Sequence, residues 1–370
     1  MKIAFVGNTS FSLYNFRLRV MKSFVEQGYQ VFAIAPEDKY SSLFKAECIK
    51  FVRLNIDGKG MSVLTDFVLL YKLVRLYHKQ SFDFVFHYTI KPIIYGSLAC
   101  RLSGIKSIAV TTGLGYAFDG DNFLSKFVVF LYKISLSKVN EVWFLNPDDK
   151  AIFVQKRIVE QDRTYILRSE GVNTDIFCPQ KKEVVSGKFI FLFLSRLVKD
   201  KGIEEFAMAA KNLKVMYPDI ECQILGKTDI RNPNNIAIDK VVQWESEGFI
   251  HYFPDSMDVR TYIANSDCVV LPSYYREGIP RCLMEAMSMK RPIITTNNVG
   301  CKELIEDEVN GKVCQPKDVE SLTRKMVEMY MLSKEMRDLM GEAGHQKILA
   351  QFDEKFIIDI YTHKLNSYIK

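Results

Sequence analysis

The sequence predicts an α/β protein with two Rossmann-like domains, each a doubly wound parallel sheet, facing each other across a cleft. A length of 370 residues exceeds one typical core and suits two domains of about 150 to 200 residues. Short apolar runs alternate with longer helical stretches, and this alternation begins twice along the chain. With 48% hydrophobic and 25% charged residues, the composition is typical of a soluble globular protein.

The first half carries short apolar runs that we expect to form one parallel sheet. These runs are residues 2–6, 30–35, 51–54, 83–88, 107–111, 141–145 and 164–167. Helices are expected between them at residues 14–27, 61–79, 92–102 and 122–138. Such a strand–helix–strand order favours parallel strands with helices on both faces of the sheet.

The second half repeats this pattern after a polar, proline-containing segment at residues 178–183. Strands are expected at residues 189–194, 221–225, 250–252, 267–271 and 292–296, with helices near residues 203–216, 259–265 and 283–289. An amphipathic stretch at residues 356–368 follows. We therefore expect one domain at residues 1–178, a second at residues 185–350, and a C-terminal helix at residues 351–370 that packs back on the first domain.

The excess positive charge lies entirely in the first half. Residues 1–180 contain 23 Lys and Arg against 16 Asp and Glu, and the remaining residues contain 27 against 28. A basic half suits an anionic membrane surface or a phosphate-bearing substrate, and a solvated face without a partner explains it equally well. Nucleic acid is not an expected partner, because the sequence contains no nucleic-acid-binding module.

The eight cysteines form no C-x-x-C pair and no Cys/His cluster with zinc-ligand spacing, so we expect reduced, structural thiols and no metal site. The longest apolar runs fall far short of the roughly 18 residues that a membrane span needs. The N-terminal segment suits a buried first strand better than a signal peptide. A cytoplasmic protein is therefore expected.

Two cations follow the first strand of the second half. Arg196 and Lys201 lie five residues apart in the turn from Ser195 to Gly202, directly before a predicted helix. Backbone N–H groups at a helix N-terminus bind anions, and the two side chains add positive charge, so this turn favours a diphosphate. The alternative is a solvated basic loop.

A second polar turn follows the strand at residues 267–271. It carries Glu277 and Gly278, and Pro280 opens a helix that contains Glu285. Gly278 permits close backbone approach to a ligand, Glu285 can accept hydrogen bonds from a ribose diol, and Glu277 can hold a sugar hydroxyl and stabilise positive charge at the anomeric carbon. Each glutamate alone is typical of a surface charge. The presence of both in one strand–turn–helix unit, downstream of the basic turn, favours a binding site.

Residues 196–311 resemble the retaining glycosyltransferases of the group that contains the bacterial family 4 enzymes, which have the GT-B fold. The family's Glu-x7-Glu pair is matched by Glu277 and Glu285, and its R-x4-K-G loop by Arg196, Lys201 and Gly202. The resemblance implies that the two cations hold the donor diphosphate, that the second glutamate holds ribose, and that the first lies against the donor sugar. The implied catalytic residues are Arg196, Lys201 and Glu277, and the implied donor-binding residues are Gly7, Ser195, Arg196, Lys201, Gly278, Ile279, Pro280 and Glu285.

Three turns of the first half suit an acceptor site, because each follows a predicted strand. The first half resembles bacterial transferases that extend lipid-linked glycans, including N-acetylgalactosaminyltransferases that act on undecaprenyl-diphosphate sugars. This resemblance implies that Arg17 and Lys91 contact an acceptor diphosphate, and the expected acceptor-binding residues are Arg17, Lys91, Gly113, Leu114 and Gly115. The alternative is a solvated Lys91 and a glycine turn without a ligand.

One departure from the family concerns the general base. Many members carry a histidine in the turn that here reads Thr112-Gly113-Leu114, and the nearest equivalent, His87, lies at a strand end where a structural role is commoner. We assign no general base, since in a front-face retaining mechanism the leaving phosphate can take the acceptor proton. The fold implies no obligatory metal, and the sequence has no D-x-D motif suited to a metal–diphosphate bridge.

These features predict retaining, metal-independent transfer of a hexose or N-acetylhexosamine from a UDP-sugar co-substrate, without another cofactor, to a glycan acceptor linked to undecaprenyl diphosphate. Two rivals remain: a sugar-nucleotide epimerase of the same architecture, and a sugar-nucleotide-binding protein without transfer activity.

Residues 123–133, with Lys126 and Lys133 among large apolar residues, suit either docking on an anionic bilayer or a buried helix. Docking would make the protein peripheral at the inner face of the cytoplasmic membrane.

Overall fold

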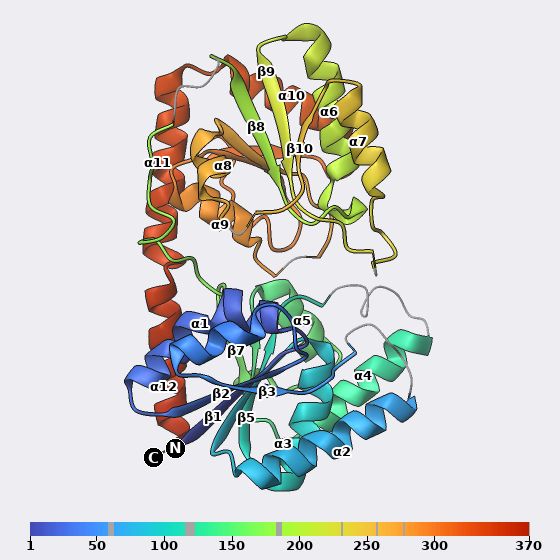
Figure 1. Ribbon diagram of the computed structural model, residues 1–370, viewed down its shortest axis with the longest axis vertical. Helices are drawn as coiled ribbons and strands as arrows, with labels where there is room; N and C mark the ends of the chain where they lie inside the picture. The colour runs from blue at the N-terminus through green and yellow to red at the C-terminus, as the bar shows by residue number, and fades with distance from the viewer. Residues whose placement is uncertain are drawn as a thin grey trace. The chain divides into compact units, whose positions relative to one another are not determined.

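The computed structural model describes residues 1–57, 63–114, 123–182, 187–230, 232–256, 258–276 and 278–369. Two predicted site residues, Gly115 and Glu277, lie outside these ranges. The chain forms two compact units: unit 1 comprises Met1–Glu170 and Glu354–Lys370, and unit 2 comprises Gly171–Asp353 (Figure 1). The sequence predicts domain boundaries at residues 178 and 350. These are boundaries between domains that fold independently, and they stay a prediction.

Within the described residues, unit 1 is built on a seven-stranded parallel sheet of order β3-β2-β1-β4-β5-β6-β7. Its strands are β1 (Lys2–Val6), β2 (Gln30–Ala35), β3 (Lys50–Arg53), β4 (Phe84–Tyr88), β5 (Lys106–Thr111), β6 (Glu141–Phe144) and β7 (Thr164–Ile166). Its helices are α1 (Ser10–Glu26), η1 (Ser41–Glu47), α2 (Val63–Gln80), η2 (Pro92–Gly96), α3 (Ser97–Ser103), α4 (Phe123–Leu136), α5 (Pro147–Gln155), η4 (Gln161–Arg163) and α12 (Glu354–Ile369).

Alternate residues of β1 point to opposite faces of this sheet, and both faces are buried. Ala4 and Val6 belong to a core cluster that includes Leu73 of α2. On the other face, the Phe5 ring centroid lies 6.0 Å from that of Phe24 in α1. Figure 1 accordingly shows α2, α3 and α4 on one side of the sheet and α1 and α12 on the other.

Helix α12 is formed by the last residues of the chain and completes the core of unit 1. The Tyr361 ring lies 4.8 Å from that of Trp143, and its hydroxyl hydrogen-bonds that of Tyr88 at 2.9 Å. Lys364 and Tyr368 both donate to the Glu141 carboxylate. The first and last parts of the chain therefore share one core.

Within the described residues, unit 2 contains a six-stranded parallel sheet of order β10-β9-β8-β11-β12-β13. Its strands are β8 (Phe189–Leu194), β9 (Ile220–Leu225), β10 (His251–Phe253), β11 (Cys268–Leu271), β12 (Ile293–Thr296) and β13 (Gly311–Cys314). Its helices are η5 (Lys199–Lys201), α6 (Ile203–Met216), α7 (Ile238–Ser246), α8 (Arg260–Asn265), α9 (Arg281–Ser288), α10 (Val319–Met331) and α11 (Lys334–Gln351).

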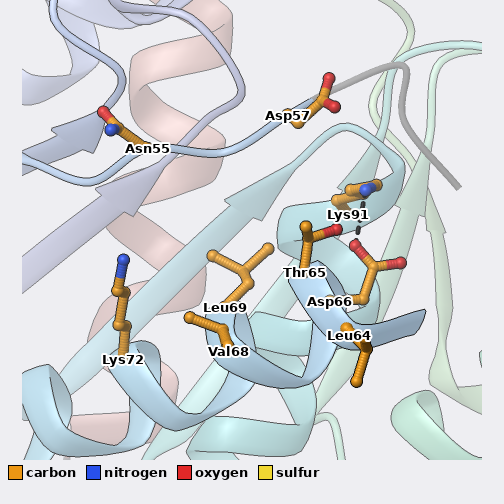
Figure 2. A pocket seen from close by; sticks show the side chains of 9 residues that line it. All are labelled: Asn55, Asp57, Leu64, Thr65, Asp66, Val68, Leu69, Lys72 and Lys91. Atoms are coloured by element: carbon orange, nitrogen blue, oxygen red, sulfur yellow. Dashed lines mark hydrogen bonds and ion pairs between the residues drawn. The ribbon is translucent and has the colours of Figure 1, made fainter. Parts of the chain in front are cut away.

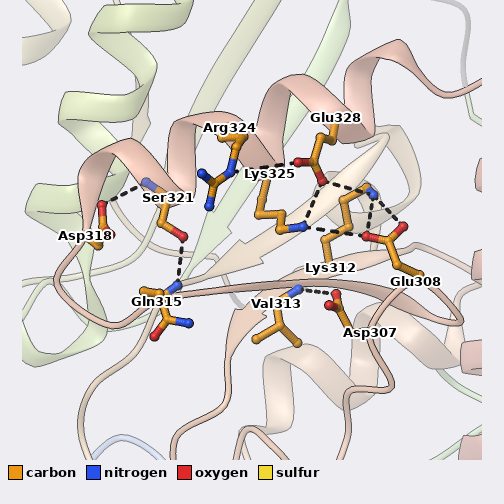
Figure 3. Close-up of polar contacts among 10 residues, drawn as sticks. All are labelled: Asp307, Glu308, Lys312, Val313, Gln315, Asp318, Ser321, Arg324, Lys325 and Glu328. Carbon is orange, nitrogen blue, oxygen red and sulfur yellow. Dashed lines mark hydrogen bonds and ion pairs between the residues drawn. The ribbon is translucent and has the colours of Figure 1, made fainter.

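An ion network holds the edge strand β13 to α10 (Figure 3). Lys312 is only 3% exposed, and its ammonium donates to Glu308 at 2.7 Å and lies 3.3 Å from Glu328. Lys325 adds a second ammonium 2.9 Å from Glu328. A buried lysine is tolerated here because two carboxylates surround it.

The two parallel α/β sheets confirm the predicted fold class. In each sheet the strand order reverses at one point, between β1 and β4 in unit 1 and between β8 and β11 in unit 2. Ligands of doubly wound sheets bind beyond the strand carboxyl ends at such points. A ligand site is therefore expected in the turns that follow these four strands.

Candidate functional site

The two motifs of the second half follow the two strands that flank the switch point of unit 2. Strands β8 and β11 pair in parallel, with Cys268 opposite Phe191. Ser195 therefore begins one turn, and Pro272 begins the other, at the same edge of the sheet. Motifs separated by about 75 residues in sequence thus become neighbours in unit 2.

The backbone carbonyl of Asp200 joins the two turns. It accepts hydrogen bonds from the N–H groups of Tyr274 at 2.9 Å and Tyr275 at 3.0 Å, and from the Ser273 hydroxyl at 3.1 Å. Three donors on one carbonyl hold the second turn in a fixed position against the first. The site is braced before any ligand arrives.

Gly202 makes the close approach of the two turns possible. Its φ of +76° lies in the left-handed region, and a Cβ at this position would clash with the carbonyl oxygen of Pro272. Gly202 also precedes α6 directly, so the orphan N–H groups of that helix lie beside the turn. Glycine in the R-x4-K-G motif is therefore required by packing as well as by backbone conformation.

The two cations of this turn lie in different surroundings. The Arg196 side chain is 50% exposed, with Nη1 3.1 Å from the Asp229 carboxylate. Lys201 is 9% exposed, and its Nζ lies 5.7 Å from the centroid of the Tyr275 ring. Arg196 thus lies at the surface of the turn, and Lys201 within it.

The remaining described donor-site residues of unit 2 follow β8 and β11 or lie on α9. Pro280 is the N-cap of α9, Gly278 is buried, and Ile279 packs against the core of unit 2. Glu285 on α9 is 8% exposed, and its carboxylate accepts from Arg281 Nε at 2.8 Å. Burial raises the pKa of Glu285, and the nearby guanidinium opposes that rise. Glu277 lies outside the described residues.

Three side chains that the sequence did not indicate support these turns. Asn234 donates to the Asp200 carboxylate at 2.9 Å, and Asn298 donates to the Tyr275 carbonyl at 2.8 Å. Asp229, which pairs with Arg196, belongs to the segment after β9. Asp200 itself lies inside the R-x4-K-G motif, between Arg196 and Lys201. This place in the motif is the one sequence signal that could have identified it.

In unit 1, the structure places Arg17 inside the fold. Its side chain is 5% exposed, it pairs with Glu170, and its guanidinium lies 4.4 Å from the Tyr88 ring centroid. Gly7 follows β1 and its N–H donates to the Ile34 carbonyl at 3.1 Å. Arg17 therefore links α1, β4 and the segment after β7. A contact between Arg17 and an acceptor diphosphate stays a prediction.

Lys91 and the turn after β5 lie at the carboxyl edge of the same sheet. Lys91 Nζ donates to Asp66 Oδ1 at 2.6 Å, and Tyr95 donates to Asp66 Oδ2 at 2.8 Å. Gly113 has a φ of +113°, and Leu114 is 2% exposed and packs in the core. Gly115 lies outside the described residues.

His87 is a core residue. It is fully buried in β4, and its Nε2 lies 2.9 Å from the Tyr77 hydroxyl. Burial lowers its pKa to about 3, so the imidazole is neutral at physiological pH. A solvent-shielded His87 matches the structural role expected of a strand-end histidine.

Among the described residues, no group of three or more His, Cys, Asp or Glu side chains is arranged to hold a metal ion. Within the same part of the chain, no helix combines the length and apolar character needed to cross a membrane.

Two family models match the chain. Residues 177–347 match the model described as glycosyl transferases group 1, and residues 2–146 match that described as glycosyl transferase 4-like. Together the two models span most of both units.

Two of the similar proteins are bacterial transferases. The N,N'-diacetylbacillosaminyl-diphospho-undecaprenol alpha-1,3-N-acetylgalactosaminyltransferase of Campylobacter jejuni is 26% identical, with all of both chains covered. The UDP-Gal:alpha-D-GlcNAc-diphosphoundecaprenol alpha-1,3-galactosyltransferase of Escherichia coli is 25% identical over 80% of this chain and 78% of its own length.

Solved structures share the fold at low identity. HepE of Anabaena, in complex with UDP and glucose, has a TM-score of 0.82 and 16% identity over 99% of this chain and 100% of that chain. A glycosyltransferase of Rickettsia africae also has a TM-score of 0.82, with 18% identity over 100% and 98% of the two chains. Both likenesses establish the GT-B fold for this chain.

Proposed function

Since this chain belongs to the group 1 family of glycosyl transferases, we propose that it moves a hexose or N-acetylhexosamine from a UDP-sugar to a glycan on undecaprenyl diphosphate. The proposed transfer retains the anomeric configuration of the donor and needs no metal ion. The names of the two bacterial relatives support the acceptor class, and the UDP complex of HepE supports the donor class.

The observation that carries this proposal is the pair of turns joined at Asp200. A diphosphate is strongly anionic and needs several directed donors and nearby positive charge. The turn after β8 supplies Arg196, Lys201 and the N-terminus of α6. As the bond between the anomeric carbon and the β-phosphate breaks, negative charge grows on the leaving UDP, and Lys201 stabilises that charge.

The two glutamates take the roles that the family motif implies. Glu285 binds the ribose hydroxyls of the donor through a carboxylate that Arg281 keeps oriented. Glu277, outside the described residues, is assigned by the motif alone to the donor sugar. No general base is assigned, and the leaving phosphate takes the acceptor proton.

A nucleotide screen tests the donor class. UDP and a UDP-sugar are expected to raise the melting temperature more than GDP or ADP, and turnover of UDP-sugar is expected only with an undecaprenyl-diphosphate-sugar acceptor. The anomeric configuration of the product is read by NMR, and the rate is expected to persist in EDTA. Conversion of UDP-sugar without any acceptor would instead favour an epimerase, and absence of any UDP effect would contradict the donor site.

We also propose that unit 1 docks on an anionic membrane through α4. Lys126 and Lys133 of α4 and Lys156, directly after α5, line a pocket of about 230 Å³ together with Ser125 and Val129. On the same helix, Phe127 is 43% and Phe130 is 56% exposed. Three ammonium groups beside exposed aromatic rings suit lipid phosphates and the bilayer boundary.

Vesicle co-sedimentation tests the docking. The wild-type chain is expected to bind vesicles that contain phosphatidylglycerol, and Lys126→Glu with Lys133→Glu is expected to reduce that binding at least tenfold. Lys79→Glu, a charge reversal on an exposed lysine of α2, serves as the control. Equal binding to pure phosphatidylcholine, or equal loss in the control, would count against docking through α4.

A further inference from the structure

Unit 1 contains a pocket of about 350 Å³ beside the carboxyl ends of β3 and β4 (Figure 2). Its described lining comes from the segment after β3, the first half of α2, and the turn after β4: Asn55, Asp57, Leu64, Thr65, Asp66, Val68, Leu69, Lys72 and Lys91. The volume is within the range of small-molecule sites, and the place is where doubly wound sheets bind ligands.

The charges of this pocket are balanced. Its described lining carries two carboxylates, Asp57 and Asp66, and two ammonium groups, Lys72 and Lys91. Lys91 and Asp66 pair at 2.6 Å, with side chains only 11% and 15% exposed. A diphosphate that approached Lys91 would meet the Asp66 carboxylate at the same place, and like charges repel in such partly dehydrated surroundings.

The lining chemistry instead suits an uncharged polyol. Carboxylate, amide and hydroxyl groups, from Asp66, Asn55 and Thr65, pair with the donor and acceptor hydroxyls of a sugar. Leu69 and Val68 supply an apolar wall against which the C–H face of a ring can pack. Tyr95 and Lys91 hold both oxygens of Asp66, so the carboxylate is oriented before a ligand binds.

We propose that this pocket holds a neutral sugar ring of the acceptor glycan, a hexose or N-acetylhexosamine, rather than the acceptor diphosphate. The inference rests on the proposed function, because it takes the acceptor to be a glycan. Asp66 binds ring hydroxyls, and Lys91 and Tyr95 are positioning residues that hold its carboxylate. This assignment competes with the diphosphate contact expected of Lys91.

Saturation-transfer NMR on the full chain tests the pocket, with the methyl glycosides of glucose, galactose, N-acetylglucosamine and N-acetylgalactosamine as probes. At least one glycoside is expected to receive saturation, and Asp66→Asn is expected to weaken its binding at least tenfold. Asp162→Asn removes an exposed carboxylate elsewhere in unit 1 and is expected to leave the affinity within twofold. Excess inorganic pyrophosphate is expected not to displace the glycoside.

Asn55→Leu is a second variant, because it changes an exposed lining residue and leaves the Asp66 pair intact. It is expected to weaken glycoside binding at least fivefold with an unchanged melting temperature. Displacement by pyrophosphate, wild-type affinity in both lining variants, or absence of saturation for all four probes overturns the proposal. UDP binding is followed in the same samples: UDP binding without glycoside binding removes only the pocket, and the reverse result contradicts only the proposed donor site.

Discussion

The basic residues predicted for the two units differ in how the fold treats them. In unit 1, Arg17 and Lys91 each pair with an acid in mostly buried surroundings. In unit 2, Arg196 is half exposed and pairs with Asp229 where water screens the pair. A diphosphate can replace Asp229 at small cost, whereas displacing Glu170 from Arg17 would leave a buried charge without compensation.

This difference teaches that a cation beside the switch point is not by itself a phosphate ligand. The surroundings decide between a structural pair and a residue available to substrate, because desolvation makes a buried pair costly to break. Variants of the two arginines should therefore act on different quantities: Arg17, buried with Glu170, on the unfolding free energy, and the half-exposed Arg196 on the catalytic rate.

The largest expected effect is on stability, from Arg17→Leu. Loss of the guanidinium leaves Glu170 unpaired, and we expect the free energy of unfolding to fall by about 3–5 kcal/mol. Arg19→Leu is the matched control on the same helix, because Arg19 is 47% exposed in its pair with Glu354, and a loss of at most about 1 kcal/mol is expected. Denaturant titrations measure both, and equal losses would erase the proposed distinction.

Next in size is the effect of Lys201→Ala on transfer. Removal of a charge that stabilises the leaving diphosphate should cost about 2–4 kcal/mol of transition-state free energy, which is about 30- to 900-fold in kcat/KM. Arg196→Ala should act in the same direction. Lys199→Ala, an exposed lysine of the same turn, should stay within about threefold of wild type. Near-normal turnover in both the Lys201 and Arg196 variants would remove their assignment.

A smaller difference is expected between Gly202→Ala and Gly248→Ala, and it tests whether the joined turns matter. Gly202 and Gly248 have φ values of +76° and +80°, but a Cβ at Gly248 meets no atom within 4 Å. Gly248→Ala should therefore cost only the left-handed backbone strain, about 1–2 kcal/mol. Gly202→Ala should cost about 1–3 kcal/mol more, because it pushes the turns apart, and should weaken UDP binding. Equal melting temperatures of the Gly202→Ala and Gly248→Ala variants would show that the turns can move apart at Pro272 without loss of stability.

The smallest expected effect is the pH dependence of the melting temperature of the Glu285→Gln variant. Burial raises the pKa of the folded-state carboxyl, so its stabilising contribution is present below the unfolded value of about 4.3 and is lost as pH rises through the folded value. The glutamine variant should therefore gain in melting temperature relative to wild type between pH 4 and pH 7.5, while its UDP affinity falls. A constant difference across this pH range would contradict the buried-carboxylate account.

The sequence predicted the central strands well because buried parallel strands are continuous apolar runs. β1, β2 and β8 have the predicted bounds. β13 was not predicted, since it is short and contains Lys312, a residue type that indicates a surface position. Its charge is buried only because Glu308 and Glu328 lie beside it, and those contacts depend on tertiary structure.

The candidate site was predicted as a set of residues but not as a set of contacts. Motif spacing identified Arg196, Lys201 and Glu285. It could not identify the pairing of Arg17 with Glu170, which lies 153 residues along the chain, or the bracing role of the Asp200 backbone carbonyl. Backbone acceptors carry no side-chain signal in a sequence, and long-range acids become visible only when the sheet is assembled.

Unit 1 is built from two separate stretches of the chain, and this arrangement has a consequence for biosynthesis. Unit 2 is one continuous stretch, whereas unit 1 needs Tyr361 and its neighbours on α12 to cover Trp143 and Phe86. On the ribosome, the aromatic side of the sheet of unit 1 stays uncovered until α12 has been made, which happens after the whole of unit 2 has been made. Packing of α12 therefore completes unit 1 late, and chains that lack α12 are expected to be substrates for chaperones or proteases.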